Sequence, residues 1–150
     1  MCTNNFKVKF FTTAPMRLEN RRKLKIFINR FLLENANYLS GEINYIFCND
    51  KDLLQINQDF LHHDFYTDIV TFDLSAPESN LLHSEIYISV DRVKDNARVN
   101  LRPFKEELHR VIFHGILHLC GYKDKTKREE ALMRSMEDKC LNEYFNFVSQ

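Results

Sequence analysis

The sequence predicts a single α+β domain over residues 1–150, in which a mixed four-stranded sheet packs against about five helices. Three observations lead to this prediction. The chain has 150 residues, the size of one compact domain with a substantial hydrophobic core. Segments of alternating apolar and polar residues are interleaved with segments of helical periodicity. Only three Gly and three Pro are present, which leaves little room for linkers.

The strands are predicted from alternation, because successive side chains of a strand point to opposite faces of the sheet. In the first of them, Phe6, Val8 and Phe10 alternate with lysines. The turn-rich segment 75–80 separates the last two strands. The four predicted strands are 6–11, 42–48, 69–74 and 85–90.

The helices are predicted from apolar residues at helical spacing and from residues that favour helix ends. Asp50 and Asp91 are expected to be the N-caps of two short helices. Pro103 suits the first turn of the fourth helix, and Gly121 is placed to end that helix. The five predicted helices are 17–36, 51–60, 92–100, 103–119 and 127–148.

The charge balance excludes one class of function. The chain has 21 Lys plus Arg and 21 Asp plus Glu, so its formal net charge is zero. A protein that packages DNA by bulk positive charge is therefore excluded. Binding of nucleic acid through a local basic patch stays open, because affinity follows the local arrangement of charge.

The cysteines and the apolar segments indicate a cytoplasmic protein with reduced thiols. No two cysteines have the CxxC spacing of a zinc ribbon or a thioredoxin-type site, and we expect all four to be small core residues. The N-terminal segment lacks the pattern of a secretory signal, and no apolar run approaches the roughly 18 residues of a membrane span. No membrane association is expected. The cysteines are Cys2, Cys48, Cys120 and Cys140.

A metal site is predicted at the end of the helix 103–119. His114 and His118 are one helical turn apart, so their side chains share a face and are close enough to bind one ion. Gly121 lets the chain reverse after the helix, so Asp124 can return toward the two imidazoles as an oxygen ligand. The predicted ligands of a single divalent ion are therefore His114, His118 and Asp124, with zinc favoured and other divalent metals possible.

The residue after the first histidine argues against a peptidase. In HExxH metallopeptidases the residue after the first His is a Glu that acts as general base, and here this position is Gly115. Helical projection places Glu107 and Arg110 on the same polar side of the helix as the histidines. Glu107 lies two helical turns before His114 and could support a metal ligand, but we expect it to be a surface acid.

The segment around the histidines resembles a known signature. Residues 114–124, HGILHLCGYKD, resemble the HGxLHLxGYDH motif of the YbeY endoribonucleases, the rRNA maturation factors. Upstream, 67–72 (TDIVTF) is similar to the TDVLSFP strand of that family, and 84–89 (SEIYIS) is similar to its GDIxIS strand. The final helix of the family is matched at Glu130, Met133 and Glu137.

The resemblance implies a single-strand-specific, metal-dependent endoribonuclease. Such an enzyme would act in 16S rRNA 3′ end maturation and ribosome quality control, and a water activated by one bound zinc would hydrolyse the phosphodiester. The implied partners are single-stranded RNA and the small ribosomal subunit, and a monomer suffices. Two positions depart from the family pattern: the third ligand is Asp124 instead of His, and the Arg expected ahead of TDV aligns with Leu61.

The remaining site residues are predicted from their chemistry. His62 and His63 follow Leu61 and are the predicted catalytic residues, because an imidazole transfers protons at neutral pH. Basic side chains in the first helix and beside the metal site are expected to contact phosphates. These predicted RNA-binding residues are Arg21, Arg22, Lys25, Lys123 and Lys125.

Two other functions stay open from the sequence. The chain could be a non-catalytic small-subunit assembly factor whose metal is purely structural, in which case four protein ligands are expected. It could also be a metallopeptidase-like hydrolase, which Gly115 disfavours.

Overall fold

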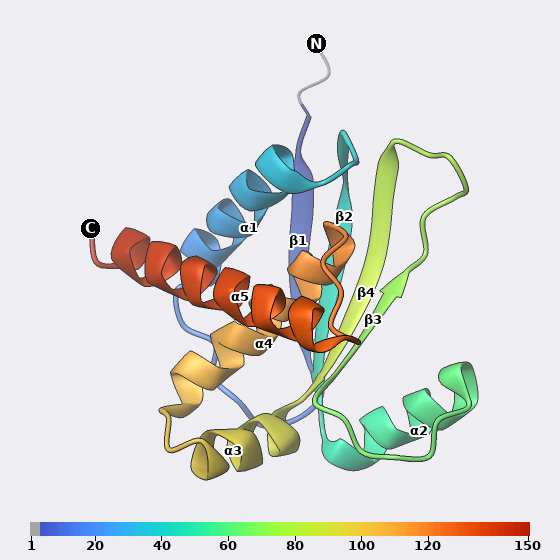
Figure 1. Cartoon of the computed structure of the whole chain (residues 1–150), viewed down its shortest axis with the longest axis vertical. Coiled ribbons are helices and arrows are strands. Elements are labelled where there is room, and N and C mark those ends of the chain that lie inside the picture. Colours follow the sequence, from blue (N-terminus) through green and yellow to red (C-terminus); the bar gives the residue numbers. More distant parts are fainter. Residues whose placement is uncertain (1–3) are drawn as a thin grey trace.

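The computed structural model describes residues 4–150 and confirms a mixed four-stranded sheet with five helices (Figure 1). The strands lie in the order β1 (Phe6–Thr12), β2 (Ser40–Cys48), β4 (Leu81–Ser89) and β3 (Ile69–Asp73). The first three are parallel, whereas β3 is antiparallel to β4. The helices are α1 (Arg21–Asn35), α2 (Asp50–Leu61), α3 (Val90–Val99), α4 (Phe104–Leu119) and α5 (Lys127–Val148).

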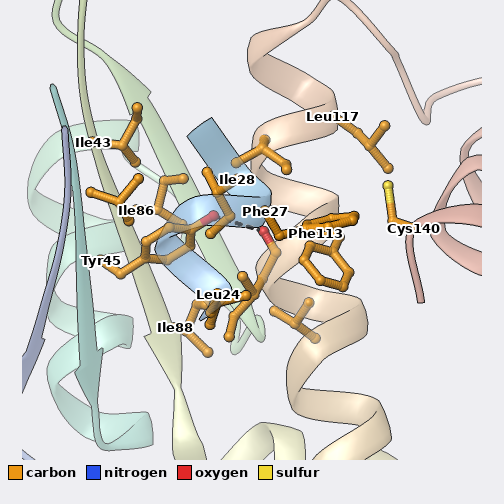
Figure 2. Close-up of a cluster of buried hydrophobic side chains, with 14 of the residues drawn as sticks. Leu24, Phe27, Ile28, Ile43, Tyr45, Ile86, Ile88, Phe113, Leu117 and Cys140 are labelled. Atoms are coloured by element: carbon orange, nitrogen blue, oxygen red, sulfur yellow. Dashed lines mark hydrogen bonds between the residues drawn. The ribbon is translucent and has the colours of Figure 1, made fainter. Parts of the chain in front are cut away.

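One hydrophobic core joins the sheet to α1 and α4 (Figure 2). Tyr45 of β2 is fully buried, and its hydroxyl donates a hydrogen bond of 2.9 Å to the backbone oxygen of Ile112 in the middle of α4. This bond and the surrounding apolar contacts fix α4 on the sheet. Helix α5 then crosses over α4 on the side away from the sheet (Figure 1). The position of the metal ligands depends on the packing of α4 against the sheet and of α5 against α4.

Helix α4 approaches the sheet closely at Gly115. A Cβ atom at Gly115 would lie 3.0 Å from Cδ1 of Ile86 and 3.3 Å from Cδ1 of Ile69. This position therefore faces the sheet and not solvent. A Glu side chain here could not serve as a base, which gives a structural reason for excluding peptidase chemistry of the HExxH kind.

Four predicted helix starts were wrong, and in one of them Pro103 is the N-cap of α4, one residue before that helix begins. Asn49 and Ser89 are the N-caps of α2 and α3, and their side chains accept the backbone N–H groups of Asp52 and Arg92. Asn49 precedes Asp50, and Ser89 lies two residues before Asp91, so each N-cap has a second capping residue nearby. Spacing alone does not choose between the two. The predicted helix 17–36 begins only at Arg21. The predicted caps Asp50 and Asp91 lie inside the first turns instead.

The cysteines of the described part are core residues, as expected. Cys48 and Cys140 are buried and Cys120 is half-buried, all as free thiols. Burial raises the pKa of the Cys120 and Cys140 thiols to about 12. Cys2 lies outside the described residues. Within residues 4–150, no helix combines the length and the apolar character needed to cross a bilayer.

His109 is a buried histidine of the core between α4 and α5. Its side chain stacks on the ring of Tyr144 at 5.2 Å, and Nδ1 lies 2.7 Å from the backbone oxygen of Lys105. The Nε2 atom is buried and has no partner within the described structure. Burial lowers the pKa of His109 below its usual 6.5, because the charged ring would lose its hydration.

The variant His109→Phe is expected to make the protein less sensitive to acid. The folded state holds His109 neutral, whereas the unfolded chain takes up a proton as pH falls through about 6.5, so stability is lost below that pH. Phenylalanine removes this proton uptake and keeps the aromatic packing. Urea unfolding near pH 7.5 and about pH 5.5 should show a smaller drop in the free energy of unfolding for the variant than for the wild type. An equal drop in both proteins would contradict the assignment.

Candidate metal centre and cleft

The three predicted ligands converge on one point at the end of α4. The Nε2 atoms of His114 and His118 are 3.0 Å apart, and Oδ2 of Asp124 lies 3.2 Å from the first and 3.3 Å from the second. Ligand atoms held about 2.0–2.1 Å from a tetrahedral zinc ion lie about 3.3 Å from one another. The triangle therefore has the size that one small divalent ion requires.

The hydrogen bonds of the imidazoles fix which nitrogen faces the site. Nδ1 of His114 lies 2.7 Å from Oε2 of Glu137, and Nδ1 of His118 lies 2.9 Å from the backbone oxygen of Tyr122. Both partners are acceptors, so each neutral ring carries its proton on Nδ1 and presents a lone pair at Nε2. Two lone pairs and a carboxylate oxygen would repel one another without a cation. The donor set therefore fits a divalent metal.

The turn after α4 brings Asp124 back, as the sequence predicted. Gly121 has φ 97°, a left-handed conformation that strongly favours glycine. The backbone N–H of Tyr122 then reaches the oxygen of Leu117 at 3.0 Å and closes the helix end. This reversal also places the Tyr122 oxygen against His118. One glycine thus positions a ligand and the support of a second ligand.

Helix α5 supplies a residue that the sequence analysis matched to the family's final helix but to which it gave no role. Glu137 is buried, and its two oxygens contact His114 on one side and Nη1 of Arg110 on the other, at 2.7 and 3.0 Å. Nη2 of Arg110 also contacts Asp138 at 2.7 Å. The guanidinium and Glu137 therefore hold the ring of His114 in place. A signal was present: Glu137 falls in the apolar stripe of α5, whose buried residues are Met133, Cys140, Leu141 and Tyr144.

The expectation that Glu107 is a surface acid was wrong. Glu107 and Arg110 are each only 6 % exposed. Both residues lie on the polar side of α4, as predicted, but α5 packs on that side. This contact joins segments that are far apart in the sequence. Projection of one helix does not reveal which neighbour packs on it.

The local charges favour a protonated or metal-bound His114. Burial by itself would lower the pKa of the ring, but the hydrogen bond and charge of Glu137 outweigh it, and Asp124 and Asp68 add to the same direction. The pKa of His114 is therefore raised. Burial raises the pKa of Asp68, which precedes β3 and lines the cleft beside the ligands. The site thus has an excess of negative groups around its three ligands, as a cation requires.

The variant Glu137→Gln is expected to weaken zinc binding by about 10- to 100-fold, because a residue that orients a metal-ligating histidine contributes about that much. Glutamine keeps an oxygen for Nδ1 of His114 but loses the charge. Competition with a chromogenic zinc chelator measures the affinity. Glu143→Gln, an exposed substitution on the same helix, is the matched control and should bind as the wild type does. Unchanged affinity in Glu137→Gln would show that Glu137 does not support the ligand.

A cleft of about 670 Å³ opens beside the metal ligands. It runs along β3 and the loop before it, and the triad forms part of its wall. His63 and Phe65 line it together, with their rings stacked at 5.1 Å and 21°. Lys125 is the one Lys or Arg among the described residues that line it. The cleft therefore combines the metal ligands, an aromatic face and a single cation.

The structure brings only some of the predicted site residues to this cleft. His63 and Lys125 line it, together with Leu61 at the position where the family motif has Arg. His62 is exposed and ends α2 in a left-handed conformation with φ 56°, outside the residues that line the cleft. Lys123 lines a separate hollow on the other side of the turn.

The predicted basic residues of the first helix lie away from the cleft. Helix α1 packs against β1, whereas the cleft lies along β3, and these two strands are opposite edges of the sheet (Figure 1). The Nζ atom of Lys25 lies 5.8 Å from the ring centre of Phe10 on β1. A role in RNA binding stays a prediction for Arg21, Arg22 and Lys25.

The family model described as "Endoribonuclease YbeY" matches residues 9–145. The chain belongs to the YbeY endoribonuclease family. A YbeY endoribonuclease of Cytophaga hutchinsonii is 48% identical over 133 residues, which cover 89% of this chain and 92% of that relative. Another, of Flavobacterium psychrophilum, is 54% identical over 71% of this chain and 75% of the relative. The solution structure of TM1509 from Thermotoga maritima matches 94% of this chain and 89% of its own, with TM-score 0.58 and 25% identity.

Membership of the YbeY family confirms the resemblance carried by residues 114–124. The two histidines of the YbeY motif are present, and the structure assembles them with Asp124 at the position where the motif has His. A carboxylate there preserves a ligand atom and lowers the net charge of a loaded site by one unit relative to a third imidazole. Among residues 4–150, this is the one group of His, Cys, Asp and Glu side chains with the geometry of a metal site.

Proposed function

We propose that this chain is a zinc-dependent, single-strand-specific endoribonuclease of the cytoplasm that matures the 3′ end of 16S rRNA and takes part in ribosome quality control. Its substrate is rRNA in the context of the small ribosomal subunit, and it acts as a monomer. One observation carries the proposal: two imidazole lone pairs and one carboxylate oxygen converge in the wall of an open cleft. Three protein ligands leave coordination positions free, which suits hydrolysis better than a structural ion.

The metal would be held by His114, His118 and Asp124, and when bound it would supply Lewis acidity for phosphodiester hydrolysis. Glu137 and the Tyr122 oxygen keep the two rings oriented, so that the ligand geometry exists before the metal binds. Zinc suits this nitrogen and oxygen donor set, and manganese or nickel is tolerated because one ligand is a carboxylate.

The cleft residues would bind and orient the RNA. Lys125 offers its ammonium group to a phosphate beside the triad. The stacked pair of His63 and Phe65 offers an aromatic face to a base, and His63 is also the residue placed to transfer a proton. His62 would need a rearrangement of its loop to share that role. Lys123 and the basic residues of α1 would contact phosphates of flanking RNA outside the cleft.

The recessed position of the ligands favours single-stranded RNA. The side chains of His114 and His118 are 19% and 31% exposed, so a phosphodiester must enter the cleft to reach them. A single strand can bend and splay its bases onto an aromatic face, whereas the bases of a duplex are already stacked and paired. We therefore expect cleavage in loops and single-stranded ends.

Chelator treatment followed by metal return tests the proposed activity. The purified chain should cleave a labelled single-stranded RNA spanning an rRNA 3′ end, lose that activity after chelation, and regain it with zinc but not with magnesium. The same RNA annealed to its complement should be cleaved at least about tenfold more slowly. Tight zinc binding without any cleavage would instead favour the assembly factor with a structural metal. Cleavage that survives complete removal of the metal would contradict the proposal.

A further inference from the structure

The outer edge of β3 forms the floor of the cleft. Among the described strands β3 pairs with β4 alone, so its other edge is open. The backbone N–H of Leu74 donates to the oxygen of His83 at 2.7 Å. Because ladder bonds alternate along an antiparallel pair, the even-numbered residues of this segment face β4. The backbone N–H and C=O groups of Ile69, Thr71 and Asp73 therefore face away from β4, and these three residues all line the cleft.

These open backbone groups select the kind of chain that can pair with them. Within residues 4–150, the oxygen of Ile69 is the one among them that accepts a side-chain donor, Oγ1 of Thr67 at 3.4 Å. Donors and acceptors recur along such an edge every second residue, about 6.4–6.8 Å apart. An extended polypeptide carries the same series of donors and acceptors, whereas the phosphate groups of a nucleic acid only accept. The edge therefore favours a peptide strand.

The cleft has walls on both faces of β3. Ile69 and Val70 are consecutive, so their side chains point to opposite faces of the sheet. Ile69 lies close to Gly115 of α4, whereas Val70 packs with Leu53 of α2. The cleft is lined on one side by the end of α4 and the turn after it, and on the other by the end of α2 and its following loop. A fifth strand on β3 lies between these walls and directs alternate side chains at each.

The two walls differ in their chemistry. Leu61 and Phe65 on the α2 side are 39% and 56% exposed, so they offer apolar surface. Asp73 is exposed and shares the face of Ile69, which is the α4 side. Lys125 is the one basic side chain of the described residues in the cleft. Apolar side chains of a bound strand therefore suit the first wall, and polar or basic side chains suit the second.

We propose that the open edge of β3 is a peptide-binding site, at which an extended segment of a partner protein adds as a fifth strand. The segment is net positive, with apolar side chains toward Leu61 and Phe65 and polar or basic side chains toward Asp73. Its main-chain groups pair with those of Thr71 and Asp73, a recurring way in which a peptide extends a sheet. The bound segment fills the cleft beside the metal ligands and excludes RNA from them. Peptide binding does not depend on the proposed nuclease function, whereas the exclusion of RNA does.

A designed peptide tests strand addition. The probe is a fluorescein-labelled peptide of sequence Lys-Val-Thr-Val-Thr-Val-Lys with blocked termini, mixed with the zinc-loaded chain. One version carries N-methyl groups on its valines and another on its threonines, so each version lacks the N–H donors of one edge. Fluorescence anisotropy should show saturable binding of the parent peptide, at least about tenfold weaker binding of one methylated version, and nearly unchanged binding of the other. Absence of saturable binding, equal affinities of all three peptides, or equal losses in both methylated versions would contradict strand addition.

Two matched substitutions locate the site on β3. Thr71→Pro removes the outward N–H and keeps the bonds to β4, because proline is tolerated on an edge strand where the N–H faces outward. The parent peptide should bind this variant at least about tenfold more weakly, while zinc affinity stays at the wild-type level. Thr12→Pro makes the same change at the opposite edge of the sheet, on β1, and should keep full affinity for the peptide. Equal binding to both variants would overturn the assignment, and the methylated peptides decide if Thr71→Pro does not fold.

Competition separates this inference from the proposed function. The parent peptide should displace a fluorescent 2′-O-methyl oligouridylate from the zinc-loaded chain, and the methylated version that binds weakly should not. A peptide that binds without displacing the RNA would overturn the claim that the two share the cleft. Absence of metal-dependent cleavage would remove the proposed nuclease, and the peptide affinities would still decide whether β3 binds a strand.

Discussion

Replacing His118 by alanine is expected to abolish zinc binding and to lower the rate of RNA cleavage at least about a thousandfold. The variant removes one of three ligand atoms, and a site with only His114 and Asp124 holds the ion too weakly to remain loaded. Loss of the metal removes several kcal/mol of transition-state stabilisation, which corresponds to a factor of this size. Elemental analysis of the purified variant and a single-turnover cleavage assay measure the two effects.

His118 is a cleaner position for this test than His114. Its side chain is 31% exposed, and its Nδ1 atom contacts only the backbone oxygen of Tyr122. His114→Ala would also leave the buried carboxylate of Glu137 without one of its partners. The matched control is His83→Ala, an exposed histidine on β4 that does not line the cleft. Cleavage by His118→Ala at the wild-type rate would mean that the activity does not come from this site.

The ligand triad could be predicted from the sequence because it is a local structure. The spacing of His114 and His118 sets their geometry through the helix itself, and Gly121 alone returns Asp124 to them. The same locality explains why the existence of every helix and strand was predicted from periodicity. The two N-cap errors involve choices between neighbouring capping residues, a difference too small for spacing to resolve.

The support of the triad could not be predicted because it depends on contacts between distant segments. Glu137 reaches His114 only because α5 crosses α4, and the same crossing buries Arg110 and Glu107. The separation of α1 from the cleft follows from the strand order, which places β1 and β3 at opposite edges. No pattern within the first helix carries that information. Local rules predicted the metal ligands, but they did not predict which distant segments pack around those ligands.

Breaking the buried ion pair of Arg110 and Glu137 by removing one partner should cost more stability than breaking any exposed pair in the described chain. The two side chains are 7% and 8% exposed, so Glu137 has little access to water. Arg110→Met keeps the apolar stem but removes the guanidinium, and it leaves the carboxylate buried without its cation. We expect this variant to lower the free energy of unfolding by about 3–5 kcal/mol, a large part of the about 5–15 kcal/mol typical of a domain.

Urea unfolding of the metal-free protein in the presence of a chelator measures the loss without a contribution from zinc binding, and two further variants establish its cause. Asp138→Asn removes the other partner of Arg110, but that carboxylate is 54% exposed, so the cost should be below about 1 kcal/mol. The double variant Arg110→Met/Glu137→Gln should recover part of the loss, because it removes the uncompensated charge that Arg110→Met creates. If the double variant were as unstable as the sum of both single variants, lost packing and not the buried charge would be the cause. The support of His114 would then depend on how α5 packs and not on the ion pair.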